Sequence, residues 1–284
     1  MIAGKTEEEV YKAIGLPWIE PELRENEGEI EAALKGRLPK IIEYNDIKGD
    51  LHCHSNWDGG ENSVEEMTQA AMDMGYEYIG ISDHTKFLRI ENGIDEKQLL
   101  AQHEEIKKIN EKFNKRGIKF RVLHGCEANI MTDGTIDIKD DVLAKLDYVI
   151  AGVHSALKQE KIKMTERLVR AIKNPNVDII SHPTGRLIGR RDEYLVDFDK
   201  MLKAAKETGT ILEINSSPER LDLRDLYIRR AKNEGVKMII NTDSHRKDQL
   251  LLMEYGIGQA RRGWAEKEDI INTKPVEKLL EYFK

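Results

Sequence analysis

The sequence predicts an α/β barrel that follows a short arm, and three observations lead to this fold class. From Gly49 onward, short apolar segments rich in β-branched residues alternate with amphipathic helical segments, a pattern typical of parallel sheets with helical connections. Seven strand-like segments are present, and polar side chains gather at their carboxyl ends, which favours a closed barrel. The length of 284 residues suits one such domain. An open doubly wound sheet is the alternative.

Residues 1–48 are expected to form the arm, because their composition differs from that of the rest. The segment TEEEVYKAIG predicts a short helix with its N-cap at Thr6 and its end near Gly15. An extended piece and a second helix are expected in residues 15–39. We expect the arm to be too short and too polar to form a core of its own.

Residues 49–284 hold the predicted strands and the helices between them. The strands are expected at 49–55, 78–84, 119–130, 148–154, 177–183, 211–217 and 238–245. Residues 63–75 predict a helix with a serine cap and a glycine stop, and residues 95–117 predict a long charged helix. No glycine-rich phosphate loop follows a strand, so neither a dinucleotide site nor an ATP site is expected.

The composition describes a folded protein with a well solvated surface. Hydrophobic residues make up 39% and charged residues 34%, and the mean hydropathy is −0.58, which disfavours disorder. Neither a membrane helix nor a signal peptide is evident, and there are only two cysteines, which predicts a cytoplasmic protein without a membrane partner. The net charge of −7 provides no general basic field for nucleic acid, so any such contact must be local or aided by bound cations.

Histidines mark the predicted functional site. Six of the eight fall at the carboxyl end of a predicted strand: His52, His54, His84, His154, His182 and His245. One such histidine alone is more often an ordinary core or surface residue. Six at the same end of successive strands point to a shared site, because these ends converge in a parallel barrel.

The alternation of side chains along a strand sharpens this prediction. His52 and His54 share one face, and so do Asp243 and His245. Glu127 has two carboxylate oxygens and could bridge two ions. Imidazoles with a few carboxylates suit zinc, manganese or iron, so a multinuclear transition-metal site is expected.

Neighbouring residues are interpreted differently. Cys53 and Cys126 each lie one position from a proposed ligand, so alternation directs them into the core between strands and helices. Asp50 and Asp83 precede proposed ligands. Either they contact the ligand imidazoles on the side away from the metal and orient them, or they are simply buried and hydrogen-bonded.

The motifs GDLHCHS, ISDH, GCEANI, GVHSA, SHPTGR and NTDSH resemble those of the polymerase and histidinol phosphatase (PHP) superfamily, in the same order. This resemblance implies a distorted seven-stranded (β/α)7 barrel, similar to a TIM barrel, with two or three divalent ions at its carboxyl-terminal mouth. The ligands of the first ion would be His52, His54, Glu127 and Asp243. The second ion would share Glu127 and be bound by His154 and His182. The third would be held by His84 and His245.

The arm resembles the segment that joins the polymerase core to the PHP domain in bacterial and archaeal family X DNA polymerases. HPTGRLIGRR and LEINSSPERLDL are similar to the same subfamily. Nothing in the chain resembles the polymerase core, so polymerisation is not carried over. A separate PHP protein or a domain of a longer one is expected, with a polymerase as a possible partner.

One loop departs from the family pattern. The family usually supplies a third-metal ligand five or six positions after the second histidine, whereas HSNWDGGENS places Asp58 four positions after His54 and Gly59 at the fifth. We favour Asp58 as a ligand of the third ion, because the adjacent glycines permit unusual backbone angles.

The resemblance implies a metal-dependent phosphoesterase in which Glu127, Asp243 and His154 take part in catalysis. Arg186 and Arg220 are the stronger candidates for binding substrate phosphate, whereas Arg190 and Arg191 are equally well explained as solvated surface residues.

Three functions stay open. The first is a nuclease for DNA ends that resembles the 3′–5′ exonuclease of family X polymerases, with manganese. The second is a phosphatase for small monoesters, and the third is a structural module without catalysis. The nearly complete ligand set argues against the third.

Overall fold

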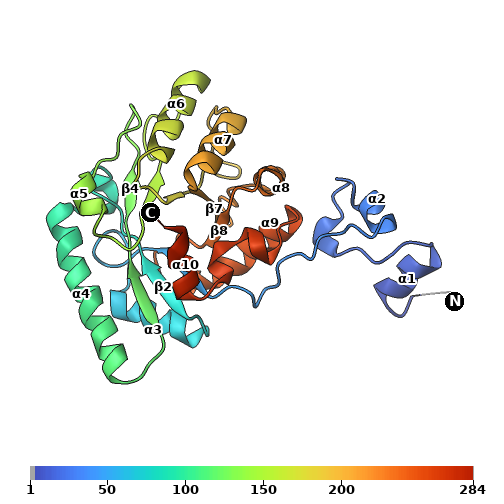
Figure 1. The fold of residues 1–284 in the computed structure, drawn as a ribbon, viewed down its shortest axis with the longest axis horizontal. Coiled ribbons are helices and arrows are strands. Elements are labelled where there is room, and N and C mark those ends of the chain that lie inside the picture. The colour runs from blue at the N-terminus through green and yellow to red at the C-terminus, as the bar shows by residue number, and fades with distance from the viewer. Residues whose placement is uncertain (1–3, 284) are drawn as a thin grey trace.

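The computed structural model describes residues 4–283, and parallel strands surrounded by helices form its main body (Figure 1). In this range the strands are β1 (Gly49–Cys53), β2 (Tyr78–Ile81), β3 (Arg121–His124), β4 (Glu127–Asn129), β5 (Ile150–Gly152), β6 (Ile179–Ile180), β7 (Ile211–Asn215) and β8 (Met238–Asn241). Strands β1 to β3 form one sheet, and strands β4 to β8 form another. All the strand pairs are parallel, which confirms the predicted α/β class.

Short bridges join the two sheets at both edges. Cys53 at the end of β1 bridges Ser244 beyond β8, and the backbone N–H of His54 donates to the Ser244 carbonyl at 2.8 Å. On the other side, His84 beyond β2 bridges Glu127 at the start of β4. These bridges close the strands into an irregular barrel.

The predicted strand at 119–130 is divided in the structure, so the strands differ from the expected seven. Residues 121–124 pair with β2, whereas residues 127–129 pair with β5. At Gly125, between the two, an added Cβ would lie only 2.5 Å from the ring of Tyr148. This close approach of backbone to ring needs a glycine, and the chain passes from one sheet to the other at this point.

An apolar cluster inside the barrel takes a residue from nearly every strand. Its strand members are Leu51, Tyr78, Leu123, Ile150, Ile179, Ile211 and Ile239. Ile271 and Leu279 of the carboxyl-terminal segment belong to the same cluster. Because side chains alternate, the inward positions that follow Ile211 in β7 are Glu213 and Asn215, and these lie nearer the carboxyl ends of the strands.

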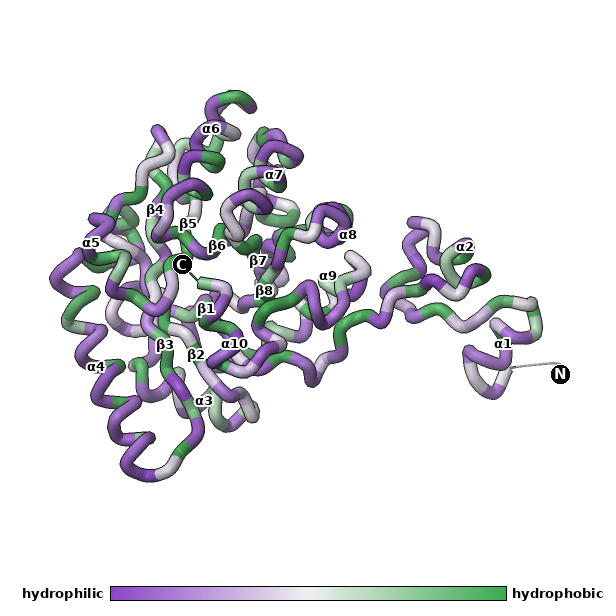
Figure 2. The backbone as a smooth tube through the Cα atoms, in the orientation of Figure 1, coloured by the Kyte–Doolittle hydropathy of each residue, from purple (hydrophilic) through white to green (hydrophobic). Residues whose placement is uncertain are grey.

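The outer helices are α3 (Val64–Asp73), α4 (Glu96–Lys115), α5 (Asp140–Leu143), α6 (Lys161–Ile172), α7 (Phe198–Thr208), α8 (Asp225–Glu234), α9 (Met253–Arg262) and α10 (Val276–Leu279). Capping boxes at Ser63 and Asp95 open α3 and α4, as predicted for these two barrel helices. Cys53 and Cys126 are free thiols buried in apolar clusters, as the alternation predicted. Figure 2 shows hydrophobic residues along the strands and a mostly hydrophilic α4. No helix within residues 4–283 is both long and apolar enough to cross a membrane.

The arm projects to one side of the barrel (Figure 1) and contains α1 (Glu7–Ala13) and α2 (Glu29–Leu34). Thr6 caps α1 as predicted. A small cluster is nevertheless buried in the arm: Ile19, Leu23, Ala33 and Ile41. Trp264, which follows α9, packs against this cluster. Arg261 of α9 donates to Glu22 at 2.6 Å, so the barrel supplies part of the arm's packing.

Candidate metal centre

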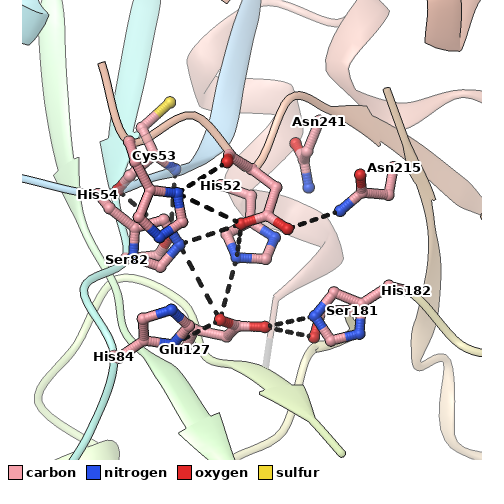
Figure 3. Close-up of polar contacts among 12 residues, drawn as sticks. His52, Cys53, His54, Ser82, His84, Glu127, Ser181, His182, Asn215 and Asn241 are labelled. Atoms are coloured by element: carbon pink, nitrogen blue, oxygen red, sulfur yellow. Dashed lines mark hydrogen bonds and ion pairs between the residues drawn. The ribbon is translucent and has the colours of Figure 1, made fainter. Parts of the chain in front are cut away.

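Glu127, the first residue of β4, lies at the centre of the predicted site (Figure 3). Its Oε2 is 2.8 Å from Nδ1 of His84 and 3.4 Å from Nε2 of His52. Its Oε1 is 3.0 Å from Nε2 of His182 and 3.2 Å from Nε2 of His154. The two carboxylate oxygens therefore face different pairs of imidazoles, which is the arrangement that a bridging ligand needs.

Asp243 forms a second acidic position beside the β1 histidines. Its Oδ1 lies 3.3 Å from Nε2 of His54 and 3.5 Å from Nε2 of His52. Its other oxygen accepts from Asn215 at 3.1 Å and lies 3.4 Å from Nε of Arg220. One oxygen is therefore held by neighbouring donors while the other faces the imidazoles.

Several nitrogen and oxygen atoms at this centre are buried without a well-aligned hydrogen bond among the described residues, although two of them, His84 Nδ1 and Glu127 Oε2, lie 2.8 Å apart. They are His52 Nε2, His54 Nε2, His84 Nδ1 and Glu127 Oε2. A buried polar atom without a partner costs free energy. Four such atoms that converge on one space fit a cation that would bind them all.

The ligand atoms gather into overlapping groups in which all atoms lie within 4.8 Å of one another. Three groups contain only predicted ligands: His52, His54, Glu127 and Asp243, then His84, Glu127 and His154, and then His54, His84 and His245. A fourth group joins the predicted ligands His54 and Asp58 to Asp83. The structure thus brings eight predicted ligands to one end of the barrel, since His182 also contacts Glu127. This donor set indicates divalent metal ions.

The PHP domain model matches residues 50–217, which is more than half of the chain. The chain belongs to the PHP family. A second model, the DNA polymerase beta thumb, matches residues 1–25 of the arm. The expectation that nothing in the chain resembles the polymerase core was therefore wrong for these residues.

Curated relatives of this PHP protein carry two kinds of name. The DNA polymerase/3′-5′ exonuclease PolX of Bacillus subtilis is 42% identical over 98% of this chain, and the match covers 48% of PolX. The chain therefore spans about half the length of that relative. A probable phosphatase of Thermoanaerobacter sp. (strain X514) is 30% identical over 83% of this chain and 94% of its own length.

A solved structure is similar in fold. Histidinol phosphate phosphatase from Lactococcus lactis, complexed with zinc, L-histidinol and phosphate, aligns with a TM-score of 0.57 at 18% identity. The alignment covers 77% of this chain and 95% of that protein. The PHP fold is thereby supported beyond the sequence motifs, and this PHP protein is a metal-dependent phosphoesterase.

Three of the imidazoles make a hydrogen bond through Nδ1 on the side away from the centre, and these bonds direct Nε2 to the centre. The supporting contacts are His52 Nδ1 to Glu213 at 2.7 Å, His54 Nδ1 to Asp58 at 2.8 Å, and His154 Nδ1 to Asn129 at 2.8 Å. When Nδ1 donates its proton to such an oxygen, Nε2 of the neutral ring keeps a lone pair for a cation. The arrangement is typical of histidines that bind metal.

Burial and neighbouring charges lower the pKa values of Glu127 and His182 and raise the pKa of His54. Burial disfavours the charged form of Glu127, but the imidazoles of His154, His52 and His84 outweigh it and hold its pKa well below the usual range. Burial lowers the pKa of His182 to about 4, so this ring stays neutral and able to bind a cation at neutral pH. For His54, burial is outweighed by the charge of Asp58, and the pKa rises to about 10.

Metal binding is expected to release protons from the metal-free protein. His54, with its pKa of about 10, is protonated at neutral pH, and it must lose this proton from Nε2 before it can bind a cation. Apparent affinity should therefore tighten as the pH rises toward that pKa, by about tenfold per pH unit for each proton displaced. Calorimetric titration of Mn²⁺ into chelator-treated protein, in buffers with different ionisation enthalpies, counts the protons. Binding without proton release, and with a pH-independent affinity, would contradict this prediction.

Glu213 is a functional candidate that the sequence analysis missed. It is fully buried in β7, and besides His52 it accepts from the backbone N–H of His182 at 2.7 Å and from Asn241 at 3.0 Å. One carboxylate thus orients ligands from β1 and from the segment after β6. The available signal was a lone acidic residue within the apolar strand sequence ILEIN.

The structure places Asp58 behind His54 and beside the backbone of the next predicted ligand. Its Oδ2 accepts from Nδ1 of His54 and, at 2.7 Å, from the backbone N–H of His84. Its role as a ligand of the third ion stays a prediction. Asp50 and Asp83 instead accept from backbone, hydroxyl or amide groups, including Thr242 and Ser55.

Asp58→Ala is expected to lower occupancy of the third ion and hydrolysis about tenfold, because the change removes a carboxylate next to His54 and His84. Combination with His84→Ala should add little to the single changes, since residues that act as a unit are strongly non-additive. Metal analysis and rate measurements on single and double variants test this. Wild-type metal content and rate in Asp58→Ala, with both lost in His84→Ala, would exclude Asp58.

The predicted arginines occupy different environments. Arg220 approaches Asp243, and its Nη1 is buried without a hydrogen-bond partner among residues 4–283. Arg186 donates to the carbonyls of Arg220 and Leu221, so its guanidinium supports the loop that carries Arg220. Arg190 is exposed and pairs with Glu219 at 3.2 Å.

Proposed function

We propose that this PHP protein is a nuclease that removes nucleotides from DNA ends in the 3′–5′ direction, with two or three manganese ions at the centre. The observation that carries the metal centre of this proposal is the set of buried nitrogen and oxygen atoms around Glu127 without a well-aligned hydrogen bond. The 42% identity to PolX of Bacillus subtilis supports DNA as the substrate. The match of residues 1–25 to a polymerase thumb supports a polymerase as partner.

The chain's own residues would prepare the reacting groups. Divalent cations, when bound, would activate water and neutralise charge on the phosphoryl group. Ser181 donates to Oε1 of Glu127 at 2.7 Å and fixes that carboxylate. His154 has a side chain 10% exposed, whereas that of Glu127 is fully buried, so His154 lies closer to an entering substrate. Arg220 would donate its unpartnered Nη1 to a phosphoryl oxygen.

A substrate panel tests the proposal. With Mn²⁺, the protein should shorten single-stranded oligonucleotides faster than it hydrolyses histidinol phosphate and similar monoesters, and added salt should slow the reaction on DNA. Strands labelled at one end or the other give the direction of digestion. Products that shorten from the 5′ end, or internal cleavage alone, would overturn the proposed direction.

A monoester phosphatase is the second candidate function. The probable phosphatase of Thermoanaerobacter, matched over 94% of its length, and the net charge of −7 favour it. Faster hydrolysis of monoesters than of DNA would establish this candidate instead. Loss of both activities in fully metal-loaded protein would favour a structural module.

A further inference from the structure

A groove is formed by the loop that follows β6 and the start of α8. Its Arg186 donates to the carbonyl of Arg220, the residue whose side chain lies 3.4 Å from Asp243 of the metal centre. The groove has a volume of about 810 Å³, and its lining includes residues 186–196, Arg224 and Tyr227. The lining contains four arginines, at 186, 190, 191 and 224, and two carboxylates, Asp192 and Glu193, in a chain whose net charge is −7. We call this feature the arginine groove.

The arginine groove is part of a firmly held structure. Asp222 is fully buried and accepts from the backbone N–H groups of Thr184, at 3.0 Å, and Gly185, at 2.8 Å. Leu187 and Arg191 exchange backbone hydrogen bonds at 2.8 Å. The groove loop therefore has a fixed shape before any ligand binds, which reduces the entropy cost of binding.

Arg191 is the groove residue whose charge interacts with that of Arg220, the arginine beside the metal centre. Arg191 donates from Nε to the Gly185 carbonyl at 2.8 Å, and among residues 4–283 no carboxylate lies within ion-pair distance of it. Burial and the positive charge of Arg220 lower the pKa of Arg191. Arg220 in turn lies 3.4 Å from Asp243. Arg191 thus has no direct ion pair among the described residues, although the charge of the buried Asp222 partly opposes the effect of Arg220.

Exposed apolar side chains accompany this charge. Ile188 is 51% exposed and Leu195 is 65% exposed, and both line the groove. A nucleic acid strand offers the matching chemistry, because it carries a phosphate at every step and apolar base faces between them. A small monoester has a single phosphate and would leave most of the groove empty.

We propose that the arginine groove binds the sugar-phosphate backbone of a single nucleic acid strand, with Arg191 contacting the phosphate next to the one at the metal centre. The inference rests on the proposed nuclease function and deepens it. The groove makes an oligonucleotide, rather than a mononucleotide ester, the preferred substrate.

Two substrates separate the groove from the centre in the Mn²⁺-loaded protein. An oligothymidylate is long enough to occupy both the arginine groove and the metal centre, whereas the p-nitrophenyl ester of thymidylate occupies only the metal centre. Arg191→Ala should raise KM for the oligothymidylate about tenfold and leave both constants for the p-nitrophenyl ester unchanged. The salt dependence of oligothymidylate binding should weaken by about 0.7 in log–log slope, as for one lost phosphate contact.

Further variants distinguish charge from structure. Arg191→Lys should restore much of the affinity and the salt slope, because it keeps the charge although it changes the contact with Gly185. Arg116→Ala, at an exposed position after α4, is the matched control and should behave as wild type. Arg190→Ala, at the exposed rim, provides a second test with a smaller expected effect if Arg191→Ala fails to fold.

The outcomes are distinct. If the wild type hydrolyses DNA while Arg191→Ala and Arg190→Ala leave KM and salt slope unchanged, the groove proposal is overturned and the nuclease proposal stands. If Arg191→Ala loses activity equally on the oligothymidylate and on the p-nitrophenyl ester, the groove proposal is also overturned, since this result shows a general effect on the metal centre. If the wild type hydrolyses monoesters and no diester, the proposed function fails first.

Discussion

Glu127→Gln is expected to remove more than one metal ion from the protein and to lower hydrolysis about a thousandfold. The Glu127 oxygens face two separate pairs of imidazoles, and an amide has lost the charge that a bridging ligand supplies. Loss of several kcal/mol of transition-state stabilisation gives an effect of about this size. Metal analysis of protein dialysed against Mn²⁺, with rates on the preferred substrate, measures both changes.

Two results would contradict this prediction. Loss of a single ion would show that Glu127 does not bridge, and unchanged metal content would place the ions elsewhere. Glu166→Gln provides the control, because it makes the same chemical change at an exposed position of α6. Circular dichroism and thermal unfolding establish that both variants keep the fold.

Glu213→Gln is expected to weaken metal binding by about 10-fold to 100-fold, although Glu213 faces no ion in the proposed arrangement. The amide that replaces the carboxylate is uncharged and brings two N–H donors to a position where His52, His182 and Asn241 all donate. At least one of these donors would lose its acceptor, and His52 would lose the contact that orients it. Competition with a fluorescent chelator measures the affinity.

The metal sites that weaken in Glu213→Gln will show whether Glu213 acts by positioning His52 and His182. Sites that include His52 or His182 should weaken, while the group of His54, His84 and His245 should change less. Equal weakening of every site would indicate a general loss of stability, and wild-type affinity would show that the Glu213 contact with His52 is dispensable. Glu166→Gln again serves as the control.

The sequence alone was sufficient for the α/β class with parallel strands and for eight of the residues that gather at the centre, although not for the number of strands or for Glu213. Parallel strands must present their carboxyl ends at one edge, so histidines at six of those ends had to converge once the alternation of strands and helices was recognised. The alternation within strands also placed Cys53 and Cys126 in the core, where the structure has them. Both inferences depend on the regular geometry of parallel strands and of side chains along a strand, which the local sequence specifies.

The tertiary structure decided what depends on contacts between distant segments. Gly125 divides a strand because the Tyr148 ring packs against it, and the arm has a buried cluster because Trp264 packs against it. Glu213 supports His52 across 161 residues, and Arg186 is used for loop carbonyls 34 and 35 residues away. Periodicity reports which face a side chain occupies, but not which partner lies opposite, because that partner is set by the packing of the whole barrel.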